Sequence, residues 1–236
     1  PEDPNNPQDN EDLLVPKSAT TVTVSDEVTM NEIDLKSGIN IISFNFLPTV
    51  SANQGLKMGD FVKLMNKDEG IITRIASFQS GAWEGGVSYD FTTKETKGFT
   101  DETLVFGKGY VIIATKDATI SVPGKTLKSS VPIAFSEGWN LVGVHGHTKA
   151  YTAQSFINSI NSTEGLQSNN VTWWPTSKGR YEGFQVSEGQ TYGQDFPISP
   201  LNGYFVRINS FQPKEANCKS IIWNPGGQKN GECGTK

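Results

Sequence analysis

Ser37-Gly-Ile-Asn-Ile-Ile42 returns one hundred residues later as Glu137-Gly-Trp-Asn-Leu-Val142, and this recurrence sets the expected architecture. Each copy places an apolar run directly after a glycine, which is typical of a buried strand that follows a turn. Four further motifs recur in the same order, displaced by 94 to 99 residues. They are Lys17-Ser-Ala-Thr20 with Lys116-Asp-Ala-Thr119, Asp60-Phe-Val with Ser155-Phe-Ile, Gly81-Ala-Trp-Glu-Gly85 with Gly179-Arg-Tyr-Glu-Gly183, and Tyr110 with Tyr204. The order predicts two tandem copies, residues 17–115 and 116–208.

Each copy predicts the same succession of elements. Short β-branched and apolar runs indicate strands, and one helix per copy is expected between N-cap residues Asp60 or Ser155 and a glycine that ends the helix. Glycine-containing turns at residues 80–81 and 178–179 then predict a hairpin. We therefore expect a mainly β (α+β) protein of antiparallel strands with one short helix per copy. Whether the copies form one domain or two is left open.

The charge of the chain is unevenly distributed. The formal net charge is −5, and five acids but no base precede Lys17, so the remainder is neutral. Residues 1–16 are rich in Pro, Asn and acids, which predicts an extended linker. A neutral body disfavours nucleic-acid binding, and no apolar run approaches the length of a membrane span.

The repeated motifs resemble a repeat found in secreted and cell-surface proteins of bacteria and archaea. That repeat combines a Gly-Trp-Asn-Leu strand, a helix, a Gly-x-Trp hairpin and a Gly-Tyr-Trp strand, and the resemblance covers residues 32–208. Ile39 stands in place of the Trp, Asn202 in place of a Gly, and Val111 or Phe205 in place of the last aromatic residue. The resemblance implies an extracellular or cell-surface location and membership of a larger modular protein. It transfers no catalytic residues.

Cys218 and Cys233 are the only cysteines and lie close together near the end of the chain. A disulfide between them would staple a polar tail, residues 209–236, that has little core of its own, and would imply an oxidising compartment. The alternative is two reduced thiols in a disordered tail.

Aromatic residues give the strongest functional indication. Aligning the copies places Trp173 at the position of Ile75 in the core and Trp174 at that of Ala76. An exposed Trp174 near Tyr181, Arg180 and Tyr192 could stack on a sugar ring, whereas the structural alternative is that Trp174 packs under the following loop. Trp83 and Trp139 belong to the repeated motifs and are expected to serve packing, Trp139 in the core.

Catalytic signals are weak in this sequence. It carries no nucleophile elbow, zinc-protease motif or phosphate loop, so we expect no enzyme and no cofactor. His145 and His147 could share one face of a strand, but nothing nearby completes a metal site, and none is expected.

Two functions from different classes remain at this point. The first is a non-catalytic surface module for attachment, whose aromatic residues bind a glycan or polysaccharide. The second is a structural spacer of a surface layer or appendage that has no small ligand. Exposure of Trp174 beside Tyr181 would favour binding, and burial of all five tryptophans would favour the spacer.

Overall fold

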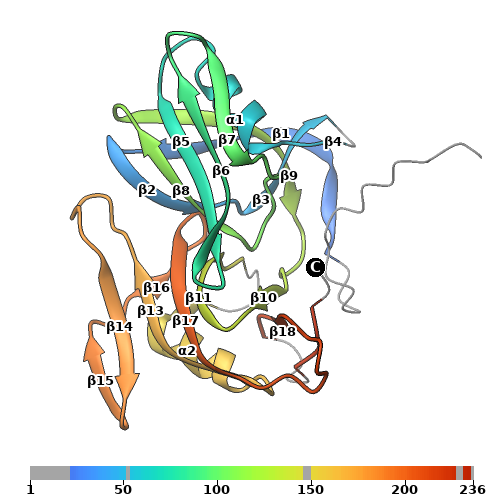
Figure 1. Cartoon of the computed structure of the whole chain (residues 1–236), viewed down its shortest axis with the longest axis vertical. Coiled ribbons are helices and arrows are strands. Elements are labelled where there is room, and N and C mark those ends of the chain that lie inside the picture. Colours follow the sequence, from blue (N-terminus) through green and yellow to red (C-terminus); the bar gives the residue numbers. More distant parts are fainter. Residues whose placement is uncertain (1–21, 52–53, 146–149, 227–230, 235–236) are drawn as a thin grey trace, which may run out of the picture.

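The computed structural model describes residues 22–51, 54–145, 150–226 and 231–234 (Figure 1). The predicted linker, the Lys17–Thr20 motif and His147 lie outside these residues. The protein is mainly β, with two short helices and antiparallel sheets, which confirms the predicted fold class. Neither helix in the described ranges has the length and apolar character needed to cross a lipid bilayer.

The elements up to residue 127 form the first half of the fold. They are β1 (Val24–Leu35), β2 (Gly38–Ser43), β3 (Phe46–Ser51), β4 (Gln54–Gly55), α1 (Met58–Met65), β5 (Ile72–Gln79), β6 (Ala82–Asp90), β7 (Glu95–Thr100), β8 (Gly109–Ala114) and β9 (Ala118–Leu127).

The second half repeats much of this succession. Its elements are β10 (Ile133–Phe135), β11 (Gly138–Gly143), β12 (Tyr151–Thr152), α2 (Ala153–Asn161), β13 (Leu166–Trp173), β14 (Glu182–Ser187), β15 (Gln190–Gly193), β16 (Pro197–Ile198), β17 (Gly203–Phe211) and β18 (Ile221–Trp223).

Two five-stranded sheets share one strand order. The first runs β2-β8-β5-β6-β7 and the second β11-β17-β13-β14-β15, so helix, hairpin and closing strand occupy equivalent places. The register matches as well, because Ile42 faces Tyr110 and Val142 faces Tyr204. Each helix covers one face of its sheet, and we call the opposite face the outer face (Figure 1).

Both helices begin earlier than predicted. Helix α1 starts after Lys57, whose side chain makes no cap, and α2 starts after Thr152. Ser155 is therefore the third helical residue, and it exchanges hydrogen bonds with Thr152 in a capping box. The N-cap predictions at Asp60 and Ser155 were wrong because a polar residue within the first turn resembles a cap in sequence.

Three buried hydrogen-bond patterns occur in both halves. The amide of Asn40 bonds the backbone of Lys36 and Gly38, and Asn140 does the same with residues 136 and 138. The hydroxyl of Tyr110 bonds both backbone groups of Val105, and that of Tyr204 those of residue 199. Burial raises the pKa of both tyrosines. Asn66 and Asn161 each tie a helix end to the next strand.

The predicted boundary between residues 115 and 116 does not separate the two cores. Strand β9 pairs with β1 and β3, and its Ile120 and Val122 belong to the first core. The equivalent pair in the second half is β10 with β18. Ile133 of β10 faces Trp223 of β18, as Ile33 of β1 faces Ile120 of β9. The first core thus closes with β9, and the second closes with the C-terminal segment.

The segment after residue 208 is more than a tail. Strand β17 continues to Phe211, and Trp223 of β18 is fully buried against Phe135, Tyr151 and Phe156. Its indole nitrogen donates to Ser159 Oγ at 3.2 Å. The expectation that this segment has little core was wrong, because Ile221 and Trp223 are buried in the core around α2.

The two outer faces meet where β2 and β8 approach β11 and β17. Ile41 and Leu141 are buried there, although neither belongs to a helix-side core. The contact is close enough to require glycine. A Cβ on Gly143 would lie 2.1 Å from Ser43 Cβ, and one on Gly109 would lie 2.7 Å from Leu141 Cγ.

Backbone hydrogen bonds join the halves at the same contact. Ser43 N donates to Leu201 O at 2.9 Å, and Gly143 N donates to Gly107 O at 3.1 Å. The donors are the last residues of β2 and β11, the edge strands at which the two sheets meet, so the two sheets are held in one arrangement.

Gly143→Ala should destabilise the protein by about 1–3 kcal/mol, because the new methyl overlaps Ser43 in a packed contact. Thermal or urea unfolding measures the loss. The same substitution in a Ser43→Gly background should cost much less, since the opposing side chain is gone. Equal losses in both backgrounds would contradict the close contact.

Candidate functional site

Five aromatic rings form a continuous strip that crosses from one outer face to the other. In order of contact the strip contains Trp83, Phe78, Phe205, Tyr181 and Trp174, and we call it the aromatic strip. Successive ring centroids lie 5.2, 5.6, 6.0 and 4.8 Å apart, all in edge-to-face arrangements. Phe78 of β5 meets Phe205 of β17, so the strip depends on both halves.

The strip is exposed near both ends. Trp83 is 53% exposed and Tyr181 is 52% exposed, whereas the rings between them are half-buried. Partial burial raises the pKa of the Tyr181 hydroxyl, so it stays protonated and can both donate and accept a hydrogen bond. Exposed aromatic rings held by half-buried neighbours form a preorganised apolar surface.

The turn between β5 and β6 fixes one end of the strip against the second sheet. Gly81 N donates to Trp139 O at 3.0 Å, and Gln79 Nε2 donates to Ala134 O at 3.2 Å. The equivalent glycine of the second hairpin, Gly179, bonds instead to Pro175 within its own turn. The two halves therefore differ at this point, and only the first hairpin makes this backbone bond to the other sheet among the described residues.

A polar row crosses the outer face of the second sheet beside the strip. Strand register places Trp139, Arg207, Asn170, Gln185 and Tyr192 side by side on neighbouring strands. Arg207, Gln185 and Tyr192 are exposed. Tyr192 lies level with Gln185, four residues along β14 from Tyr181, or about 13 Å. The face thus combines apolar rings with hydrogen-bonding groups.

The structure places the four predicted binding residues on this face with unequal spacing. Trp174 and Tyr181 are in ring contact, and Arg180 is exposed in the turn directly before Tyr181. Tyr192 is 54% exposed but belongs to the polar row. Trp174 is half-buried, which is intermediate between the stacking and packing alternatives.

The alignment of the adjacent tryptophans was shifted by two residues. Trp173 faces Tyr204 as Ser77 faces Tyr110, so Trp173 corresponds to Ser77 rather than to Ile75, and Trp174 to Phe78. A shift of two leaves each side chain on its predicted side of the strand. Trp173 packs partly buried against the second core.

Two tryptophans were misplaced by the sequence analysis. Trp83 was expected to serve packing, yet it is exposed at the start of the strip, and Trp139 was expected in the core, yet it is half-buried on the outer face. The sequence did not indicate that four further residues belong to this surface: Trp83, Phe78, Phe205 and Arg207. For Trp83 alone it held a usable signal. Trp83 corresponds to Tyr181 in the repeated motif, so exposure of one implies exposure of the other.

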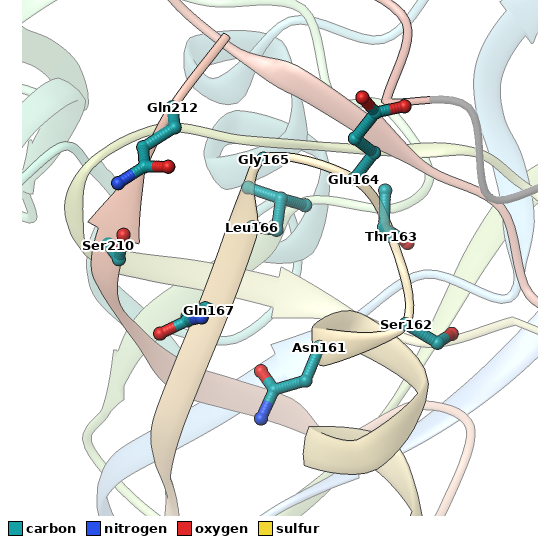
Figure 2. Close-up of a pocket in the computed structure, with 9 residues that line it drawn as sticks. All are labelled: Asn161, Ser162, Thr163, Glu164, Gly165, Leu166, Gln167, Ser210 and Gln212. Atoms are coloured by element: carbon teal, nitrogen blue, oxygen red, sulfur yellow. The ribbon is translucent and has the colours of Figure 1, made fainter.

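A shallow polar pocket of about 230 Å³ lies elsewhere, after the end of α2 (Figure 2). Figure 2 shows Asn161 to Gln167 on one side and Ser210 and Gln212 on the other. The Asn161 amide already bonds the backbone of Ser168, and Glu164 pairs with Lys214 at 2.8 Å. These groups are engaged in structural contacts, so the pocket offers no convergent chemistry.

Metal-ligating residues do not gather in the described part of the chain, where no three of His, Cys, Asp or Glu form a cluster. His145 lies in the loop after β11 and is buried next to the contact between the halves.

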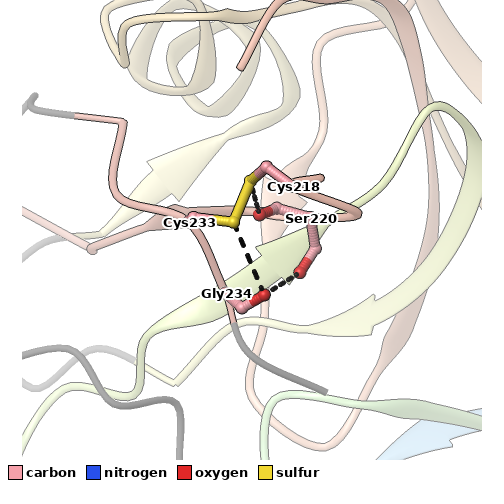
Figure 3. The surroundings of a disulfide bond; sticks show 4 residues. All are labelled: Cys218, Ser220, Cys233 and Gly234. Carbon is pink, nitrogen blue, oxygen red and sulfur yellow. Dashed lines mark hydrogen bonds between the residues drawn. A yellow bond between two sulfur atoms is a disulfide. The ribbon is translucent and has the colours of Figure 1, made fainter. Parts of the chain in front are cut away.

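Cys218 and Cys233 form a disulfide, as expected, with 5.6 Å between their Cα atoms (Figure 3). Beside it, Gly234 N donates to Ser220 O at 2.8 Å and Ile222 N donates to Glu232 O at 2.8 Å. The disulfide therefore anchors the last described residues to β18.

Comparison with protein-family models, curated proteins and solved structures finds no match to the chain.

Reduction of the disulfide, or Cys218→Ser with Cys233→Ser, should lower the free energy of unfolding by about 3 kcal/mol, because the closed loop restricts the unfolded chain. The loss should be accompanied by faster amide exchange in β18, which has only three residues to pair with β10. Unchanged melting and exchange after reduction would contradict a stabilising role.

Proposed function

We propose that the protein is a non-catalytic attachment module of an extracellular or cell-surface protein, and that its aromatic strip binds polysaccharide. The observation that carries this proposal is the exposure of Trp83 and Tyr181, near the two ends of one line of ring contacts. Sugars offer apolar ring faces with hydroxyl groups at their edges, and aromatic side chains flanked by polar groups suit both.

The shape of the surface favours a polymer over a single sugar. The strip spans two sheets, and the polar row extends the same face to Tyr192 at the opposite edge. An extended surface of this kind gains affinity from several weak contacts along one chain. Half-buried neighbouring rings hold the exposed rings in place, which limits the loss of side-chain freedom on binding.

Two observations support an extracellular location. The disulfide is of the kind that persists in oxidising compartments, and the repeated motifs resemble those of secreted and surface proteins. We also propose that the halves descend from one duplicated segment, which is supported by the common strand order and the recurring Asn and Tyr hydrogen bonds.

A structural spacer is the second candidate. Backbone hydrogen bonds join the halves at Ser43 and Gly143, and apolar residues are buried between them, which is suited to bearing load without flexing. This role requires the outer faces to be tightly joined but requires no exposed tryptophan.

Trp83→Ala and Tyr181→Ala should each reduce retention on insoluble polysaccharides, and the double variant should abolish it. Each substitution removes an exposed ring and leaves the two buried cores intact. Each stacking contact is worth about 0.5–1.5 kcal/mol, so single losses of several-fold are expected. A panel of cellulose, chitin, xylan and anionic gels, assayed by pull-down, provides the measurement.

Phe91→Ala is the matched control, since Phe91 is an exposed aromatic residue that contacts Tyr89 and not the strip. Folding of every variant is checked by thermal melting. Wild-type protein that is retained on no polysaccharide, or retention that is unaffected in the double variant, would reject the binding role and favour the spacer.

A further inference from the structure

All three arginines of the chain lie on the surface that carries the aromatic strip. Arg207 and Arg74 project from the outer faces of the second and first sheets, and Arg180 lies in the turn before Tyr181. From this placement we infer that the bound polysaccharide is anionic and carries carboxylate or sulfate groups. The inference rests on the proposed polysaccharide-binding function and specifies its ligand.

Arg207 lies in a row of otherwise uncharged side chains. Its neighbours in the polar row are Trp139 on one side and Asn170 on the other, with Gln185 next along the row. No carboxylate occupies this row. Arg207 is exposed and takes part in none of the salt bridges among the described residues. Its guanidinium is therefore available to an external anion.

The other two arginines share these properties. Arg180 and Arg74 are both exposed and outside the salt bridges of the described chain. Arg74 lies in the corresponding row of the first sheet, where Ser88 separates it from Lys97. A planar guanidinium binds carboxylate and sulfate oxygens through two parallel hydrogen bonds, and it stacks on aromatic rings, which suits acidic sugars at an aromatic surface.

The acidic residues near this surface offset part of its positive charge in the first half and less of it in the second. Glu182 pairs with Lys178, whereas Glu84 and Glu102 share Lys108 and leave one net negative charge beside Trp83. Asp90 and Glu95 form the next row of the first sheet, beside the row of Arg74, Ser88 and Lys97, so Arg207 and Arg180 are the arginines that carry the inference. The formal charge of the whole chain is −5, so general attraction to a polyanion is disfavoured and retention would require this local positive surface.

Affinity electrophoresis against matched polymers tests the inference. Hydroxyethyl cellulose and carboxymethyl cellulose differ in carboxylate, and dextran and dextran sulfate differ in sulfate. The wild-type protein should be retarded more by one or both anionic polymers than by their neutral partners, with less retardation as salt increases. The anionic polymer that shows the larger increase in retardation over its neutral partner, carboxymethyl cellulose or dextran sulfate, tells whether the surface prefers carboxylate or sulfate.

Arg207→Gln and Arg180→Gln should each weaken retardation by the anionic polymer about two- to fivefold, the range of an exposed ion pair, and leave any neutral retardation unchanged. Lys63→Gln, which removes an exposed charge on α1 at the opposite face, is the control and should have no effect.

Three outcomes decide between the possibilities. Equal or stronger retardation by the neutral polymers would overturn the anionic assignment and leave the proposed function standing. Anionic retardation that neither arginine variant reduces would overturn the assignment to this surface. Retardation by none of these polymers, together with no retention on the insoluble polysaccharides, would overturn both.

Discussion

The close approach of the two sheets at Gly109, Gly143 and Gly203 is the constraint on which the rest of the structure depends. Atoms of the opposite half occupy the space where a Cβ would lie at each of these positions, side-chain atoms first at Gly109 and Gly143 and a backbone oxygen first at Gly203. Because the strands come this near, Phe78 of one sheet reaches Phe205 of the other. A wider separation would leave two unrelated aromatic clusters in place of one strip. The glycines of the repeated motifs therefore shape the candidate site although none of them belongs to it.

The distance in sequence between partners explains which parts of the fold the sequence predicts. Asn40 and Asn140 close local turns, and Tyr110 and Tyr204 bond to residues five positions earlier, so their recurrence in sequence reports recurring local structure. The pairing of β9 with β1 links residues roughly ninety apart and leaves no local mark. For that reason the predicted boundary fell at residue 115, and the partnership of β10 with β18 was not anticipated.

The candidate site was predictable only in part, for a related reason. The Trp174–Tyr181 contact joins two ends of one hairpin, and local sequence suggested it. The contributions of Phe78 and Arg207 arise from sheet register and from contact between halves, which no local pattern encodes. The two-residue error at Trp173 came from hairpin turns of different length, since β5 and β6 are joined by Ser80-Gly81 and β13 and β14 by a longer segment.

The halves also differ at one group of equivalent positions, which is polar and charged in the first half and largely aromatic in the second. In the first, Ser77 donates to Glu102 at 2.7 Å and Lys108 pairs with that carboxylate at 3.0 Å. In the second half, strand register and equivalent backbone bonds place Trp173 at the position of Ser77, Phe196 at that of Glu102 and Asn202 at that of Lys108. The Trp173 and Phe196 rings are in contact there.

This exchange of a half-buried ion network for an aromatic pair changes what the neighbouring surface can do. In the first half Glu84 and Glu102 share Lys108 beside Trp83, so this network keeps one net negative charge next to the strip. The aromatic pair in the second half supports β13 without adding any charge beneath its outer face. Divergence at one packing position therefore confines that negative charge to the first half and keeps it from the sheet that carries Arg207, while both sheets retain the register on which the strip depends.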